Sequence, residues 1–138
     1  MRRAGRGGAS VAMEKAAPLV AVVDDEESVR KALRRLFRAS GLDCTVFASG
    51  REFLDSLRER VPDCVVLDLH MPGLTGLDVT REMKAGSKRV PTIIITAHDD
   101  ASTRERCLSA GALAYLRKPF DEKTLMEVVA GAIESRVC

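Results

Sequence analysis

Aromatic side chains are scarce in this sequence. Its 138 residues include no Trp, one Tyr and four Phe, although 46% of them are hydrophobic. An aliphatic core is therefore expected, and binding of single-stranded nucleic acid by stacking on aromatic rings is disfavoured. The longest apolar run, residues 16–23, is far shorter than the roughly 20 residues of a membrane-spanning helix, so no membrane association is expected.

Cysteine patterns typical of metal sites and disulfide frameworks are also missing. No two cysteines have CxxC spacing, and no pair of histidines lies near them in the sequence. We expect three buried, hydrophobe-like thiols and one thiol at the chain end, in a reducing compartment. The four cysteines are Cys44, Cys64, Cys107 and Cys138.

The net charge of +2 comes from the amino-terminal tail. Residues 1–17 are rich in Gly, Ala and Arg and hold four basic side chains against one acidic side chain, while residues 18–138 are nearly neutral. A DNA-binding domain normally carries a basic face of its own, so we expect that this chain itself binds no nucleic acid. We predict a disordered basic tail over residues 1–17 and one domain over residues 18–138.

Short aliphatic runs alternate with segments of helical periodicity after the tail. Two of the runs, residues 19–23 and 92–96, lack polar alternation, as is typical of strands buried on both faces of a parallel sheet. Apolar stripes mark the helices between the runs. The pattern predicts an α/β fold with helices on both faces of a parallel sheet. The predicted strands are residues 19–23, 44–47, 64–67, 92–96 and 113–116.

Capping residues and glycines predict where the helices begin and end. Capping boxes predict helix starts at Ser49, Thr75 and Ser102. Glycines predict helix ends at Gly41, Gly86 and Gly111. The helix around residues 101–110 has few apolar side chains, so we expect it to be weakly held.

Polar residues follow the predicted strands, at the edge where ligands bind in doubly wound sheets. Asp24 and Asp25 follow the first strand, Asp68 follows the third, Thr96 ends the fourth, and Lys118 follows the fifth. Three neighbouring carboxylates repel one another unless a hard cation such as Mg²⁺ binds them. A hydroxyl and an ammonium beside them suit a phosphoryl group, so the set predicts phosphoryl transfer to a carboxylate.

Other kinds of phosphate site do not fit the sequence. It contains neither GxxxxGK[ST] nor GxGxxG, which argues against a P-loop and a dinucleotide fold. The loop at residues 24–27 is acidic and would repel the phosphate of a flavin without a metal. A haloacid-dehalogenase phosphatase would need a second carboxylate two residues after its nucleophile, where this sequence has His70.

Four motifs lie at these strand ends: VVDD at 22–25, VVLDLHMPG at 65–73, IITAH at 94–98 and YLRKPF at 115–120. Together they resemble the receiver domain of bacterial two-component response regulators, and FASGREFL at 47–54 is most similar to the FixJ-type subgroup. The resemblance implies a flavodoxin-like, doubly wound sheet of strand order 2-1-3-4-5 with five helices. It also implies a phospho-accepting switch in the bacterial cytoplasm, which is no enzyme beyond catalysing its own phosphorylation and dephosphorylation.

The resemblance assigns a phosphate acceptor and a metal site. It implies that Asp68 accepts a phosphoryl group from a sensor histidine kinase or a phosphotransfer protein. Asp25 would bind Mg²⁺ directly, or Mn²⁺ in its place, Asp24 would bind it largely through water, and Asp68 would belong to the same metal site. The backbone carbonyl of His70 would be a further ligand.

The resemblance also assigns switch residues. Thr96 and Lys118 would bind the phosphoryl oxygens, the peptide bond after Lys118 would be cis, and Tyr115 would rotate inward when Thr96 moves. His70 and His98 each lie two residues beyond a site residue and are expected to rim the site. By resemblance they would tune the lifetime of the aspartyl phosphate; the alternative is that they are exposed loop residues without a role.

Partners and output stay open at this point. The basic face of the first helix either docks an acidic kinase or phosphotransfer helix or is simply solvated, and a homodimer could form through helix 4, strand 5 and helix 5. The chain is also compatible with a phosphorylation-independent interaction module or with the receiver fragment of a DNA-binding transcriptional regulator. A metal-dependent phosphatase fits less well, because no general acid or base accompanies Asp68. The basic residues are Arg30, Lys31, Arg34, Arg35 and Arg38.

Overall fold

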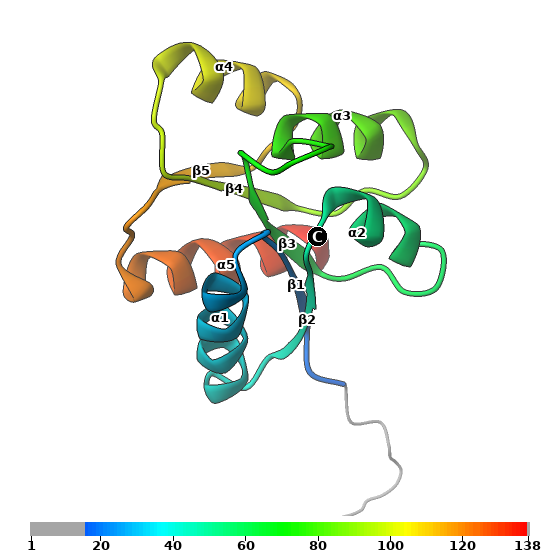
Figure 1. The fold of residues 1–138 in the computed structure, drawn as a ribbon. Coiled ribbons are helices and arrows are strands. Elements are labelled where there is room, and N and C mark those ends of the chain that lie inside the picture. The colour runs from blue at the N-terminus through cyan, green and yellow to red at the C-terminus, as the bar shows by residue number, and fades with distance from the viewer. Residues whose placement is uncertain (1–15, 138) are drawn as a thin grey trace, which may run out of the picture.

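Strands and helices alternate along residues 16–137, the part of the chain that this computed structural model describes (Figure 1). The predicted disordered tail lies almost wholly outside these residues, as does Cys138. The strands are β1 (Leu19–Val23), β2 (Asp43–Phe47), β3 (Cys64–Asp68), β4 (Thr92–Thr96) and β5 (Ala114–Arg117). The helices are α1 (Glu27–Ala39), α2 (Gly50–Ser56), α3 (Gly76–Ala85), α4 (Ala101–Ser109) and α5 (Glu122–Val137).

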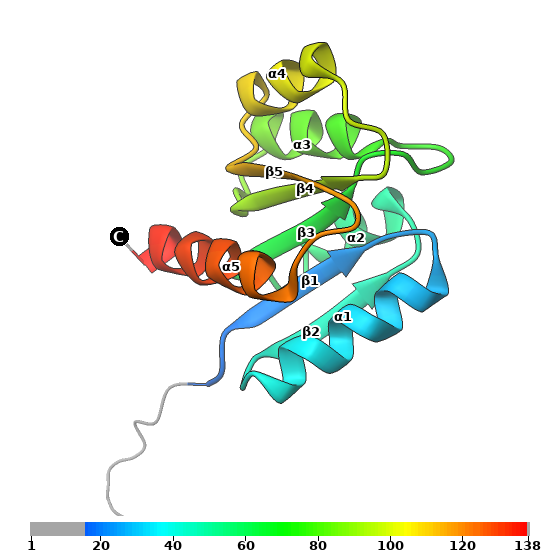
Figure 2. The ribbon, with the colours of Figure 1, turned by 90° about the vertical axis from the view of Figure 1, so that its left-hand side faces the viewer.

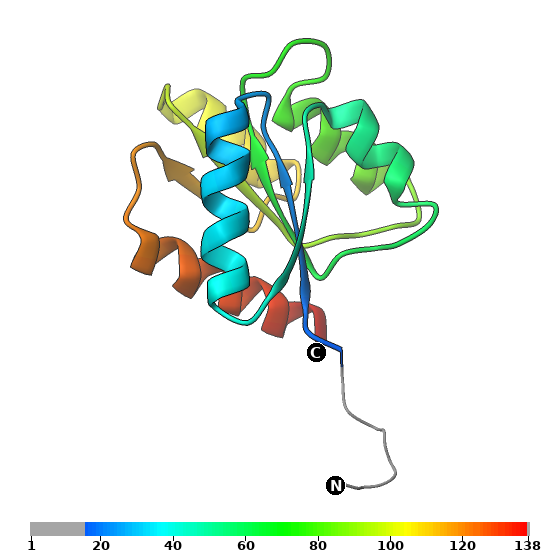
Figure 3. The same ribbon diagram turned by 60° about the horizontal axis from the view of Figure 1, so that its bottom comes forward.

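All the strand pairs are parallel, and the sheet order is β2-β1-β3-β4-β5. Helices α1 and α5 cover one face of the sheet, and α2, α3 and α4 cover the other (Figure 2). In Figure 3, which shows the molecule from a second direction, α1 crosses in front of α5. The predicted flavodoxin-like fold is therefore confirmed.

Side chains from the central strands enter two separate cores. In β3, Val65 and Leu67 pack in the cluster under α2, α3 and α4, whereas Cys64 and Val66 pack in the cluster under α1 and α5. This division explains why the central strands show no polar alternation, since both of their faces are covered. The two cores are mainly aliphatic, as expected, and Cys64 is fully buried.

The helix starts follow two of the three predicted caps. Thr75 forms a complete capping box at α3, and the Ser49 hydroxyl accepts the Glu52 N–H at α2. The third prediction, a box beginning at Ser102, is wrong. Asp100 lies two residues earlier, and its carboxylate accepts the Ser102 N–H at 3.0 Å, so α4 begins at Ala101.

Four strand bounds differ from the predictions by one residue each. Strands β3 and β5 end one residue later than predicted, at Asp68 and Arg117. Strand β5 begins at Ala114, where its pairing with β4 begins; Leu113 precedes it, with its N–H bonded to the Thr92 carbonyl and its side chain half exposed. Strand β2 begins one residue earlier than predicted, at Asp43. The helices end where the glycines predict: Gly41 and Gly111 follow α1 and α4 with positive φ values of 86° and 116°, and Gly86 caps α3 with extended backbone.

Helix α4 is the sparsely buried helix that the sequence indicates. Its buried residue is Cys107, and Leu108 is 42% exposed. Local stability depends on buried apolar contacts, so α4 is expected to open at lower free energy than the central elements. Within residues 16–137, no helix combines the length and apolar character needed to cross a membrane.

Candidate functional site

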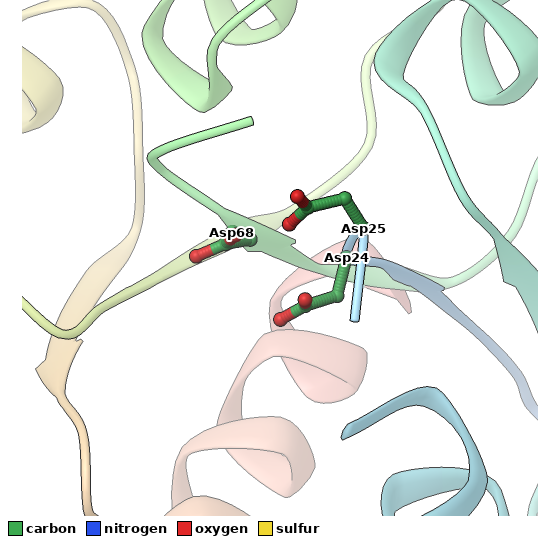
Figure 4. Close-up of side chains that lie close together, drawn as sticks. All are labelled: Asp24, Asp25 and Asp68. Atoms are coloured by element: carbon green, nitrogen blue, oxygen red, sulfur yellow. The ribbon is translucent and has the colours of Figure 1, made fainter. Parts of the chain in front are cut away.

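Three carboxylates gather at the carboxyl ends of β1 and β3. Asp24 and Asp25 directly follow β1, Asp68 is the last residue of β3, and the two strands are hydrogen-bonded neighbours. One carboxylate oxygen from each residue lies within 4.8 Å of the others. Figure 4 shows the three side chains side by side at these strand ends. Asp24 and Asp68 are buried, while Asp25 is exposed.

Lys118 brings a positive charge into this cluster from the loop after β5. Its Nζ lies 3.1 Å from Asp24 Oδ2 and 3.4 Å from Asp68 Oδ1. Its backbone N–H donates to the Thr96 carbonyl at 2.7 Å, and the following bond to Pro119 is cis, as the resemblance implied. One ammonium cannot neutralise three carboxylates, so the cluster keeps an excess of negative charge.

The electrostatics of the cluster favour a bound cation. Burial and, after it, the nearby Asp24 charge raise the pKa of Asp68 from 3.8 to about 6, even though Lys118 works in the opposite direction. Burial disfavours the charged form of Lys118, but its contacts with Asp24 and Asp68 outweigh this and raise its pKa. A negatively charged site with several carboxylate oxygens fits Mg²⁺, which binds through one or two carboxylates and keeps several waters.

Hydrogen bonds fix the loop that carries Asp24. The Asp24 N–H donates to the Phe47 carbonyl at 3.1 Å, and Asp24 Oδ1 accepts the Glu26 N–H at 2.9 Å. Its carbonyl accepts a 2.8 Å hydrogen bond from Arg30 Nη1. Sequence reasoning placed Arg30 on a basic face that was either solvated or a docking surface, and it missed this contact. Its position one helical turn after Glu26 was the available signal, since a side chain there reaches back over the first turn.

Gly76 lets α3 approach the backbone of Asp68 closely. A Cβ at this position would lie 2.6 Å from the Asp68 carbonyl oxygen, and backbone atoms cannot yield as a flexible side chain can. The Gly76 N–H donates to the Leu69 carbonyl at 2.9 Å. The absence of a side chain at residue 76 therefore helps to fix the end of β3, a contribution that the sequence analysis did not identify.

Thr96 is buried at the end of β4, and its hydroxyl bonds within its own loop. The hydroxyl donates to the His98 carbonyl and accepts the His98 N–H, both at 3.0 Å. His98 and His70 are exposed, and their rings lie 5.5 Å apart between centroids, with the planes crossing at 75°. The fold thus brings together the two histidines that were predicted to rim one site.

Tyr115 lies on β5 and is already buried, with 8% of its surface exposed. Its hydroxyl has no hydrogen-bond partner among the described residues, and the Arg104 guanidinium lies 5.8 Å from the ring centroid. Burial raises the pKa of this hydroxyl, and the Asp99 charge raises it further. An inward rotation of Tyr115 would therefore start from a ring that is already largely covered.

Comparison with known proteins identifies the family. The family model of the response regulator receiver domain matches residues 20–130. The chain is 41% identical over 130 residues to Nodulation protein W of Bradyrhizobium diazoefficiens, covering 94% of this chain and 56% of that protein. It is 40% identical over 112 residues to the DNA-binding transcriptional regulator NtrC of Klebsiella pneumoniae, covering 81% of this chain and 24% of that protein.

Solved structures agree with these matches. Full-length FixJ from B. japonicum has a TM-score of 0.81 at 32% identity, covering 88% of this chain and 60% of that chain. The chain spans about half the length of Nodulation protein W and about a quarter of NtrC. The family match over most of the described residues, together with the parallel sheet, means that this chain belongs to the response regulator receiver domain family, whose members are phospho-accepting switches.

Proposed function

We propose that Asp68 is the residue of this receiver domain that accepts the phosphoryl group. The observation that carries the proposal is the convergence of three carboxylates and the Lys118 ammonium at the ends of β1, β3 and β5. Asp24, Asp25, Asp68 and the His70 backbone carbonyl are the groups that would hold Mg²⁺, or Mn²⁺ in its place. The bound cation would neutralise negative charge on the transferring phosphoryl group.

The donor is proposed to be the phosphohistidine of a sensor kinase or phosphotransfer protein. A carboxylate oxygen of Asp68 attacks the phosphorus, the P–O bond forms as the P–N bond to the donor histidine breaks, and the electron pair stays on that imidazole. Lys118 donates hydrogen bonds to the phosphoryl oxygens as charge develops on them. The domain is proposed to be no enzyme beyond catalysing its own phosphorylation and dephosphorylation, since no general acid or base accompanies Asp68.

The switch is proposed to begin at Thr96. Its hydroxyl is engaged by the backbone of His98, so it must leave this partner before it can donate to a phosphoryl oxygen. That exchange would move the β4–α4 loop, the sparsely buried helix α4 and Tyr115. Leu108 and Leu113 are large apolar side chains exposed beside this region, which favours α4, β5 and α5 as the surface that changes its partner or forms a homodimer.

The donor protein is proposed to dock over α1 and the β5–α5 loop. A groove of about 320 Å³ lies there with a largely apolar lining that includes Val29, Leu36 and Phe120, and Lys118 lies in its wall. Lys31 is exposed on α1, one residue from the groove-lining Ala32. This chemistry suits an amphipathic helix with an acidic rim, and it places the helix beside the acceptor.

Incubation with acetyl phosphate or phosphoramidate and Mg²⁺ tests the acceptor. Intact-protein mass spectrometry should find one added phosphoryl group, which disappears in Asp68→Ala or with EDTA. Asp63→Asn is the matched control, because Asp63 precedes the same strand at its opposite end. Absence of the added mass in the parent chain would favour the phosphorylation-independent module. Rapid hydrolysis of varied phosphate esters would instead favour a phosphatase.

The proposed output is transmitted by a further protein or segment. Because NtrC is described as a DNA-binding transcriptional regulator, this chain is proposed to act as the receiver of such a regulator or to pass the signal to one. The chain itself is proposed not to bind nucleic acid. Mobility-shift assays with the phosphorylated chain and varied duplex DNA should show no salt-sensitive complex at the concentrations at which whole regulators bind.

His70 and His98 are proposed to tune the lifetime of the aspartyl phosphate. The support is the contact between their rings and the position of each histidine two residues beyond a site residue, with the His98 backbone bonded to the Thr96 hydroxyl. The half-life of the phosphoprotein should change in both His70→Ala and His98→Ala. Unchanged half-lives in both variants would leave these residues as exposed loop positions.

A further inference from the structure

The histidine pair has a geometry that neither phosphate binding nor Mg²⁺ binding requires. His70 and His98 are the two histidines in the sequence, and they come from different loops. Both rings are exposed, with centroids 5.5 Å apart and planes crossing at 75°. The contact is T-shaped, so the edge of one ring faces the plane of the other, the rings are not stacked, and their remaining edges face away from the contact. The pair therefore presents two nitrogen ligands close together.

The backbones of both histidines are held in place. The chain before His70 is fixed by the Leu69 N–H, which donates to the Ile95 carbonyl of the neighbouring strand at 2.9 Å. The backbone of His98 bonds twice to the buried Thr96 hydroxyl. Because β3 and β4 are paired directly, the two rings start from anchored positions. A chelating pair needs this kind of preorganisation, since two mobile ligands would lose entropy when they bind one ion.

We propose that His70 and His98 together bind one divalent transition-metal ion, with Zn²⁺ the ion that fits best. Zn–N bonds of about 2.0–2.1 Å place two imidazoles of one tetrahedral ion with their ring centres about 5–6 Å apart. The observed 5.5 Å lies in that range, so the exposed rings need only torsional adjustment to aim both nitrogens at a shared point. Among the described residues, the cluster of at least three potential metal ligands is the acidic one, and it includes neither histidine. Water molecules are therefore expected to complete the coordination of an ion on the histidine pair.

The two neighbouring sites should select different ions. Imidazole suits Zn²⁺, Cu²⁺ and Ni²⁺, whereas carboxylate and carbonyl oxygens suit Mg²⁺. A millimolar excess of Mg²⁺ should therefore occupy the acidic cluster and leave the histidine pair available. An ion on this pair would connect the β3–α3 loop with the loop that holds Thr96.

Imidazole NMR provides a direct test that does not depend on phosphorylation. Zn²⁺ is titrated into ¹⁵N-labelled full-length protein with excess Mg²⁺, and Cys138→Ser serves as the common background so that its thiol cannot compete. Two histidines give two sets of ring nitrogen signals. Both sets should shift together and saturate at one equivalent of Zn²⁺. In His70→Ala, the remaining His98 signals should need at least about tenfold more Zn²⁺, because the second ligand no longer binds intramolecularly; His98→Ala should give the mirror result.

Three outcomes would overturn the proposal. The first is no shift of either histidine at stoichiometric Zn²⁺. The second is two independent transitions whose affinities are unchanged when the other histidine is removed. The third is a Zn²⁺-dependent change confined to the carboxylates. If either variant fails to fold, the titration of the parent background still tests the proposal, because both sets of ring signals must then saturate together at one equivalent of Zn²⁺.

Discussion

The acceptor carboxylate is predicted to destabilise the metal-free fold, so Asp68→Asn should stabilise it. The pKa of Asp68 is raised from 3.8 to about 6 by burial and by the Asp24 charge, although Lys118 opposes the rise. At about 1.4 kcal/mol per pKa unit, this rise corresponds to an unfavourable contribution of up to about 3 kcal/mol when the carboxylate is ionised. The amide of Asn has a similar size and still accepts a hydrogen bond from Lys118, so most of that cost should be recovered.

The sign of the pH dependence follows from proton binding. Because the pKa of Asp68 is higher in the folded chain than in the unfolded chain, the folded state binds more protons between 3.8 and about 6. The contribution of Asp68 to the free energy of unfolding therefore falls as pH rises through this window. The destabilisation is complete above about pH 6 and vanishes below 3.8. The advantage of Asp68→Asn should accordingly be largest at neutral pH and small in acid.

Urea unfolding in EDTA at neutral pH and at about pH 4.5 checks this prediction. We expect Asp68→Asn to gain about 2 kcal/mol at neutral pH, several degrees in Tm, and clearly less in acid. Asp55→Asn is the control: its exposed carboxylate pairs with Arg58 at 3.7 Å, and such surface pairs contribute under about 1 kcal/mol. Saturating Mg²⁺ should stabilise the parent chain more than the variant, which has lost a ligand. A variant less stable than the parent at neutral pH in EDTA would refute the reasoning.

Two further changes test how the site is held. Gly76→Ala should cost at least about 2 kcal/mol in urea unfolding, since its Cβ would lie 2.6 Å from the Asp68 carbonyl oxygen. Gly131→Ala on α5 meets nothing within 4 Å and should gain up to about 1 kcal/mol; equal effects of the two would contradict the packing argument. Arg30→Ala should weaken Mg²⁺ binding by about tenfold in calorimetry, because the Arg30 hydrogen bond to the Asp24 carbonyl is lost. Lys31→Ala, a change at an exposed residue of the same helix, should leave the affinity unchanged. Equal affinities in the two variants would show that the Arg30 hydrogen bond does not position the loop.

The sheet was predictable because its sequence signals are local. Residues 19–23 and 92–96 were predicted as strands with the bounds that the structure has, since continuous β-branched and aliphatic runs leave no competing element. Bounds were less certain where two local choices compete. Asp100 and Ser102 can both cap a helix, and the earlier residue is the one that does so. Leu113 is an apolar residue that extends the run of the predicted strand, but the pairing of β5 with β4 begins at Ala114.

The candidate site was predictable in its members but not in its supports. Chain topology brings the ends of β1, β3, β4 and β5 to one edge, so Asp24, Asp68 and Lys118 could be grouped without knowing any distance. The Arg30 hydrogen bond and the close approach at Gly76 depend on how a helix sits against a loop, which spacing alone does not determine. The contact between the two histidine rings likewise depends on side-chain directions in two separate loops.

The same charge imbalance makes the site recognisable in the sequence and costly in the fold. A chain selected for stability alone would not place three carboxylates at one sheet edge, where the Lys118 ammonium pairs with two of them. The three are Asp24, Asp25 and Asp68. Phosphorylation would replace the single charge of Asp68 by a group with nearly two, so the need for cationic and hydrogen-bonding partners would increase. Thr96 is the nearby buried hydroxyl that can respond, provided that it releases the His98 backbone. Loss of that loop contact would be offset by contacts to the phosphoryl group, which is how a local charge change can shift the conformational equilibrium of the β4–α4 region.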